Sequence, residues 1–73
     1  MEKATVQSID RALSIIEALA GEKDGLGVTE IATRVGLHKS TVHRLLSALG
    51  ERNYVEQRSG GAYRLGMKLA EEL

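Results

Sequence analysis

Residues 28–47 have the sequence VTEIATRVGLHKSTVHRLLS, and this stretch decides the fold. Two short helical patterns flank a turn that contains one glycine, an arrangement typical of a helix-turn-helix. Ala32 is small where the two helices must cross closely, and Gly36 lies where the chain leaves the first helix and needs a positive φ. Val42 and Leu45 are the apolar residues expected to seat the second helix on the first. Together these four residues favour the motif more strongly than any one of them does.

The segment before this motif predicts another helix, over residues 8–20. Apolar residues recur there every three or four positions, which is the spacing of one helix face. Ser8 is a suitable N-cap because its hydroxyl can accept a hydrogen bond from a free N–H group of the first turn. The expected buried stripe consists of Ile9, Ala12, Leu13, Ile16, Leu19 and Ala20. Residues 21–27, GEKDGLG, are expected to form a loop.

The helix-turn-helix itself is predicted to contain helices over residues 29–35 and 39–52. Thr29 is the expected N-cap of the first of these helices. Asn53 can end the second one in a left-handed conformation. The expected buried side chains are Ile31, Ala32 and Val35 in the first helix and Val42, Leu45, Leu46 and Leu49 in the second.

After residue 53 the pattern changes to an alternation of every second residue. Residues 55–58 and 62–65 alternate in this way, and a glycine-rich SGG turn separates them, which predicts a β-hairpin. The predicted fold is therefore mainly α with a small β-hairpin: a winged helix-turn-helix, with a three-helix bundle and a wing. This domain is expected over residues 1–66, and residues 67–73 are expected to start a linker helix.

The composition excludes several classes of protein. A chain of 73 residues allows one small core, and the absence of cysteine excludes disulfides and thiolate metal sites. The sequence has neither an apolar run of about 20 residues nor a secretory signal, so we expect a soluble cytoplasmic protein without a membrane partner. The two tyrosines are the only aromatic residues, which argues against a nucleic-acid site built on stacking.

The net charge is zero, but the charges are unevenly distributed. Residues 1–30 contain three basic and six acidic residues, a balance of −3, whereas residues 34–64 contain six basic and two acidic ones, a balance of +4. Such asymmetry is typical of a domain that binds an anion with one face. A chance fluctuation on a solvated surface is the alternative.

The polar face of the helix over residues 39–52 is the candidate DNA-binding surface. Its outward side chains should be Lys39, Ser40, His43, Arg44 and Ser47, and Thr41 at the helix start can hold a phosphate. Arg44 and His43 can reach base edges in the major groove, and Ser40 can hold a phosphate. An ordinary solvated helix face is the alternative, but it predicts mixed charge, and no carboxylate occurs before Glu51. On the hairpin, Arg58 and Arg64 flank the tip, which predicts contact with the DNA backbone or minor groove, unless these arginines only make a strand edge soluble.

The sequence resembles the N-terminal winged helix-turn-helix domain of the isocitrate-lyase-regulator (IclR) family of bacterial transcription regulators. The resemblance is carried by SIDRALSIIEAL at 8–19, VTEIATRVGLHKSTVHRLLSAL at 28–49, NYV at 53–55 and YRLG at 63–66. His38 departs from the proline that the family usually has at this helix start, and Asn53 from a common glycine. The resemblance supports sequence-specific binding to double-stranded DNA, with helix 39–52 in the major groove and hairpin 54–65 on the backbone or minor groove. The candidate DNA-binding residues are Thr29, His38, Lys39, Ser40, Thr41, His43, Arg44, Ser47, Arg58 and Arg64.

The resemblance also implies properties of a longer protein. Family members normally carry a larger C-terminal domain that binds a small-molecule effector and drives assembly. It implies a homodimer or higher oligomer on an operator with two half-sites, in the bacterial cytoplasm on the nucleoid. Because the family's first helix contributes to pairing, Ile15, which lies off the main stripe, and Val6 either contact a partner or pack on their own domain.

An enzyme and a protein-binding module are the two alternative classes of function. An enzyme is disfavoured because His38 and His43 are five residues apart, which is not the zinc-helix spacing, and no cofactor or metal is expected. The stronger alternative is a winged-helix module that binds protein without DNA, since a fold does not fix a function. The salt dependence of binding distinguishes a DNA-binding domain from a protein-binding one, because phosphate contacts make DNA binding strongly salt-dependent.

Overall fold

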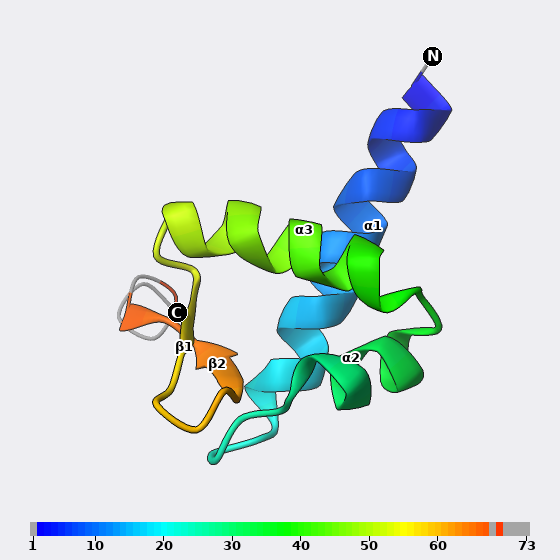
Figure 1. Cartoon of the computed structure of the whole chain (residues 1–73). Coiled ribbons are helices and arrows are strands. Elements are labelled where there is room, and N and C mark those ends of the chain that lie inside the picture. Colours follow the sequence, from blue (N-terminus) through cyan, green and yellow to red (C-terminus); the bar gives the residue numbers. More distant parts are fainter. Residues whose placement is uncertain (1, 68, 70–73) are drawn as a thin grey trace.

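Within the part of the chain that the structure describes, three helices and a two-stranded hairpin form the domain (Figure 1), as the sequence predicts. The computed structural model describes residues 2–67 and 69. The elements are α1 (Glu2–Ala20), α2 (Val28–Val35), α3 (Lys39–Glu51), β1 (Val55–Gln57) and β2 (Tyr63–Leu65). The C-terminal half of α1 lies behind α2 and α3, and its N-terminal half extends away from the rest of the domain (Figure 1). Residues 68 and 70–73, on which the expected linker helix depends, lie outside the described residues.

The first helix differs from its prediction in length and in the face that it buries. It begins at Glu2, so Ser8 lies inside the helix, exposed, and is not its N-cap. Ile15 is completely buried, whereas Ile9 and Leu13 of the expected stripe are about half exposed. The reason is that the rest of the domain packs on the side of α1 that carries Ile15 and Leu19. Ile15 therefore packs on its own domain.

The second helix begins at Val28, one residue before the prediction. Gly27 is its N-cap, and Thr29 lies inside the first turn, so the predicted cap at Thr29 is wrong. The Glu30 carboxylate accepts a hydrogen bond of 2.9 Å from the Gly27 N–H, which satisfies one group at the helix start. At the other end Gly36 has a φ of 72°, as predicted, and its N–H donates to the carbonyl of Ala32.

The third helix agrees closely with its prediction and ends one residue earlier, at Glu51. His38 is its N-cap residue, but the imidazole makes no capping hydrogen bond there. Val42 and Leu46 are buried, while Leu45 and Leu49 are partly buried at the edges of the same stripe. After the helix, Asn53 adopts the predicted left-handed conformation, with a φ of 66°.

The core is aliphatic and joins all the elements. Its buried members are Ile15, Leu19, Leu26, Ile31, Ala32, Val42, Leu46 and Val55. Full burial of one large aliphatic side chain contributes about 1.5–3 kcal/mol, so this cluster dominates the stability of the domain. Because Val42 and Leu46 hold α3 by one face, the opposite face of α3 is turned to solvent.

The hairpin is antiparallel and pairs Val55 with Leu65, Glu56 with Arg64 and Gln57 with Tyr63. A third segment, within the loop predicted over residues 21–27, joins the hairpin. The N–H of Leu26 donates to the Tyr63 carbonyl at 2.8 Å, and the N–H of Tyr63 donates to the Leu26 carbonyl at 2.7 Å. This bridge fixes the wing against the α1–α2 loop.

Candidate nucleic-acid interface

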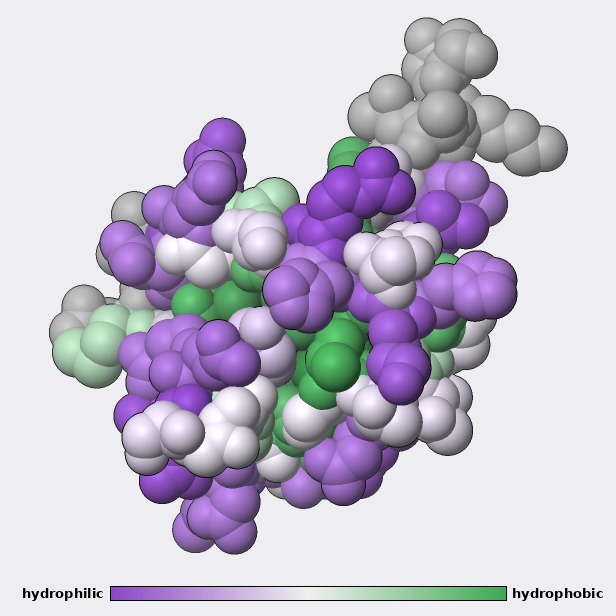
Figure 2. Space-filling model, viewed as in Figure 1, coloured by the Kyte–Doolittle hydropathy of each residue, from purple (hydrophilic) through white to green (hydrophobic). Residues whose placement is uncertain are grey.

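The exposed face of α3 forms the first part of the candidate interface. Four polar residues line a shallow, open hollow there, which we call the α3 hollow: Ser40, His43, Arg44 and Ser47. All four are exposed, because the opposite face of the helix carries the buried Val42 and Leu46. The structure thus brings together four of the ten predicted DNA-binding residues. Figure 2 shows that this side of the molecule is largely hydrophilic, with smaller hydrophobic areas between.

The start of α3 extends this face. His38 and Lys39 are both exposed, and Thr41 is half-buried. Among the residues that the structure describes, no carboxylate forms an ion pair with Lys39 or Arg44. The two cations on α3 are therefore available to an anionic partner.

A second hollow, which we call the wing groove, lies between α3 and the hairpin. Its lining residues are Leu46, Ser47, Gly50, Asn53, Val55, Glu56, Gln57 and Tyr63. Ser47 lines both hollows, so the wing groove continues the α3 hollow toward the wing. Glu56 is the one carboxylate among the described residues that line either hollow.

Sequence reasoning missed Asn53 and Gln57 as members of this surface. Gln57 is exposed in the wing groove, and its side-chain amide donates to the carbonyl of Gly61 at 3.2 Å. The alternation of the hairpin offered a signal, since Gln57 lies two residues from Val55 and on the same side of its strand. The position of Asn53 beside Ser47 depends on the packing of the wing and had no sequence signal.

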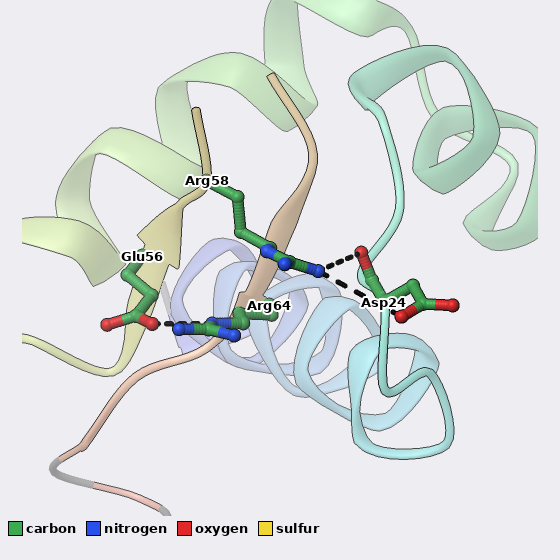
Figure 3. A network of polar contacts seen from close by, with 4 residues as sticks. All are labelled: Asp24, Glu56, Arg58 and Arg64. Atoms are coloured by element: carbon green, nitrogen blue, oxygen red, sulfur yellow. Dashed lines mark hydrogen bonds and ion pairs between the residues drawn. The ribbon is translucent and has the colours of Figure 1, made fainter. Parts of the chain in front are cut away.

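The two wing arginines are both engaged within the domain (Figure 3). Arg58 follows β1, and its Nη1 donates to the backbone carbonyl of Asp24 at 3.3 Å and lies 4.0 Å from the Asp24 carboxylate. Arg64 is in the middle of β2, and its Nε donates to the Glu56 carboxylate at 2.5 Å. Only Arg58 lies beside the turn, in a hollow that it shares with Asp24, Ser59, Gly60 and Ala62.

Thr29 lies apart from these hollows, on α2. Its side chain is exposed, and its backbone carbonyl accepts a hydrogen bond from the Thr33 hydroxyl at 3.0 Å. Of the helices that the structure describes, none combines the length and the apolar character that crossing a bilayer demands. Within the same described residues, no three His, Asp or Glu side chains are grouped as metal ligands.

Comparison with known proteins gives a consistent assignment. The IclR helix-turn-helix domain matches residues 8–59. The HTH-type transcriptional regulator XynR of Escherichia coli is 43% identical over 67 residues, which cover 90% of this chain and 27% of XynR. Pseudomonas aeruginosa HmgR superposes with a TM-score of 0.81 at 28% identity, over 90% of this chain and 29% of HmgR.

A further solved structure, an IclR family transcriptional regulator from Brucella abortus, matches with a TM-score of 0.80 at 29% identity, over 99% of this chain and 29% of that one. The chain spans about a quarter of the length of the curated relatives that it matches. XynR and the Brucella abortus protein are both transcriptional regulators. The chain therefore belongs to the IclR family of DNA-binding helix-turn-helix transcription regulators.

Proposed function

We propose that α3 enters the major groove of double-stranded DNA and contacts base edges with the side chains of the α3 hollow. The observation that carries this proposal is an exposed helix face with Ser40, His43, Arg44 and Ser47 and no carboxylate among its lining residues. The recognition helix of a helix-turn-helix approaches bases with its N-terminal part, where Lys39 and Ser40 lie. Arginine is suited to the O6 and N7 acceptors of guanine, so Arg44 is the proposed base-contacting residue.

The remaining contacts are proposed to hold the DNA backbone. Ser40, Thr41 and the free N–H groups at the start of α3 can bind phosphate oxygens, because helix N-termini attract anions. Arg58, next to the hairpin turn, is proposed to contact the backbone or the minor groove. The proposed contacts are Thr29, His38, Lys39, Ser40, Thr41, His43, Arg44, Ser47 and Arg58. Arg64, which the sequence also predicts as a contact, is paired with Glu56 and is not proposed to contact DNA in the natural sequence.

For the whole protein we propose a cytoplasmic bacterial regulator without enzymatic activity, a homodimer or higher oligomer that binds two half-sites. Its domain 1–66 is proposed to bind DNA, with a linker helix from residue 67 leading to a C-terminal domain that binds a small-molecule effector. The greater length of the curated relatives supports this organisation.

The test is selection of bound duplexes from a random pool at two ionic strengths. The domain is then titrated into the most enriched duplex, which we call the selected duplex. If about four to six phosphates are contacted, log K should fall with log salt with a slope of about −4 to −5, at about 0.9 per phosphate. Enriched half-sites one or more helical turns apart would support a dimeric regulator. Failure to bind any duplex, or binding that does not respond to salt, would refute the proposal and favour a protein partner.

A further inference from the structure

Glu56 and Arg64 are directly opposite each other in the hairpin register, and both side chains lie on the same side of the wing (Figure 3). The Arg64 Nε donates to the Glu56 carboxylate at 2.5 Å, and the side chains of Arg64 and Glu56 are 44% and 39% exposed. Opposite charges on directly opposed residues of an antiparallel pair attract each other without distortion of the strands. The Arg64 charge is therefore paired with a carboxylate on the surface of the wing.

Arg58 is held differently, which makes the two wing arginines unequal. Its hydrogen bond goes to the backbone carbonyl of Asp24, and the Asp24 carboxylate is 4.0 Å away with a fully exposed side chain. Attraction between charges that are well solvated is weak, so Asp24 neutralises Arg58 much less than Glu56 neutralises Arg64. A phosphate thus meets a weaker competing partner at Arg58 than at Arg64.

The position of Glu56 connects this ion pair to DNA binding. Glu56 lines the wing groove, which continues the α3 hollow at Ser47. The side chain of Glu56, between Val55 and Gln57, points to the opposite side of β1, so the ion pair lies on the outer side of the wing. Phosphates of a duplex that reaches the wing would meet a carboxylate that repels them and occupies Arg64. Sequence-independent affinity for DNA depends on the number of phosphates that basic side chains neutralise.

We propose that Glu56 competes with DNA phosphates for Arg64 and so limits the sequence-independent part of the affinity. Arg64 then contributes little to binding in the natural sequence and becomes a phosphate contact once Glu56 is neutral. This inference rests on the proposed DNA-binding function and adds a residue that tunes it.

A double-mutant cycle tests the proposal. The variants are Glu56→Gln, Arg64→Gln and the two together, with Glu51→Gln as the matched control because Glu51 is an exposed acid at the end of α3. Fluorescence anisotropy gives the Kd for a random duplex and for the selected duplex at several salt concentrations. Circular dichroism confirms that each variant is folded.

We expect Glu56→Gln to tighten binding to the random duplex about two- to five-fold beyond the Glu51→Gln control at low salt, the range of exposed ion pairs. The salt slope should steepen by about 0.9, the value for one additional phosphate. Arg64→Gln should leave the Kd of the natural sequence nearly unchanged but abolish the gain in the Glu56→Gln background.

Three outcomes would overturn the inference. A gain from Glu56→Gln that persists with Arg64→Gln would mean that Glu56 only repels DNA. A gain no larger than that of Glu51→Gln would mean a general charge effect, and a clear loss from Arg64→Gln alone would mean that Arg64 already contacts DNA. If the natural sequence itself shows no salt-dependent binding, the proposed function fails and this inference fails with it.

Discussion

Replacing Gly25 with alanine tests the bridge between the α1–α2 loop and the wing. Gly25 has a φ of 84°, and a Cβ atom added to it would lie 2.5 Å from the Tyr63 carbonyl oxygen. That oxygen is the acceptor of the Leu26 N–H, so the loop cannot keep its place and accommodate the new methyl group. The variant must therefore separate residues 25 and 26 from β2.

The expected cost follows from two contributions. A left-handed backbone costs a residue with a Cβ about 1–2 kcal/mol. Loss of the two backbone hydrogen bonds between Leu26 and Tyr63 costs about 0.5–1.5 kcal/mol each. Gly25→Ala should then lower the free energy of unfolding by about 2–5 kcal/mol, a large part of the roughly 4–11 kcal/mol expected for a domain of this size.

Two other glycines separate these contributions. Gly36 has a φ of 72° but no atom within 4 Å of an added Cβ, so Gly36→Ala should cost only the backbone strain, about 1–2 kcal/mol. Gly21 has open space and no positive φ, so Gly21→Ala should be neutral or stabilise by up to about 1 kcal/mol.

Urea unfolding followed by circular dichroism at equilibrium measures all three variants. Hydrogen exchange provides a local measure, since the amides of Leu26 and Tyr63 should exchange faster in Gly25→Ala and not in Gly36→Ala. Equal destabilisation by Gly25→Ala and Gly36→Ala, with unchanged exchange at both amides, would refute the close approach between loop and wing.

Three further predictions concern the interface and its support. Arg44→Ala should weaken binding to the selected duplex by about 1–3 kcal/mol and relax the preference at one or two base pairs, with an unchanged melting curve because Arg44 is exposed; an unaltered Kd would show that the recognition face is wrongly assigned. Arg58→Ala should weaken all duplexes almost equally and reduce the salt slope by about 1, as measured by titrations on selected and random DNA; a sequence-dependent loss would speak against a phosphate contact. Val42→Asp should unfold the domain, because it places a charge where the side chain is completely buried; a folded variant by circular dichroism would contradict the packing of α3.

Local sequence patterns were sufficient to predict the helix-turn-helix at the centre of this chain. Ala32, Gly36, Val42 and Leu46 have the burial or backbone conformation that their spacing predicts. Such features depend on residues within a few turns of one another, so helix geometry alone relates them. The hairpin turn and the left-handed Asn53 were predictable for the same reason.

The buried face of α1 could not be predicted in this way. The helix carries apolar residues on more than one side, and periodicity does not state which side meets the rest of the domain. The structure buries Ile15 and leaves Ile9 and Leu13 about half exposed. The choice depends on the core cluster that Ile15 joins, which includes Leu26 and Val55 from segments distant in sequence.

The sequence by itself determined the winged helix-turn-helix and the cationic outer face of α3, because backbone periodicity and turn chemistry act over short distances. Only the tertiary structure decided that Leu26 joins the wing, that Glu56 holds Arg64, and that Ser47 connects the two hollows. These relations arise from the strand register and from packing between distant segments, where many pairings are sterically possible and the core selects one.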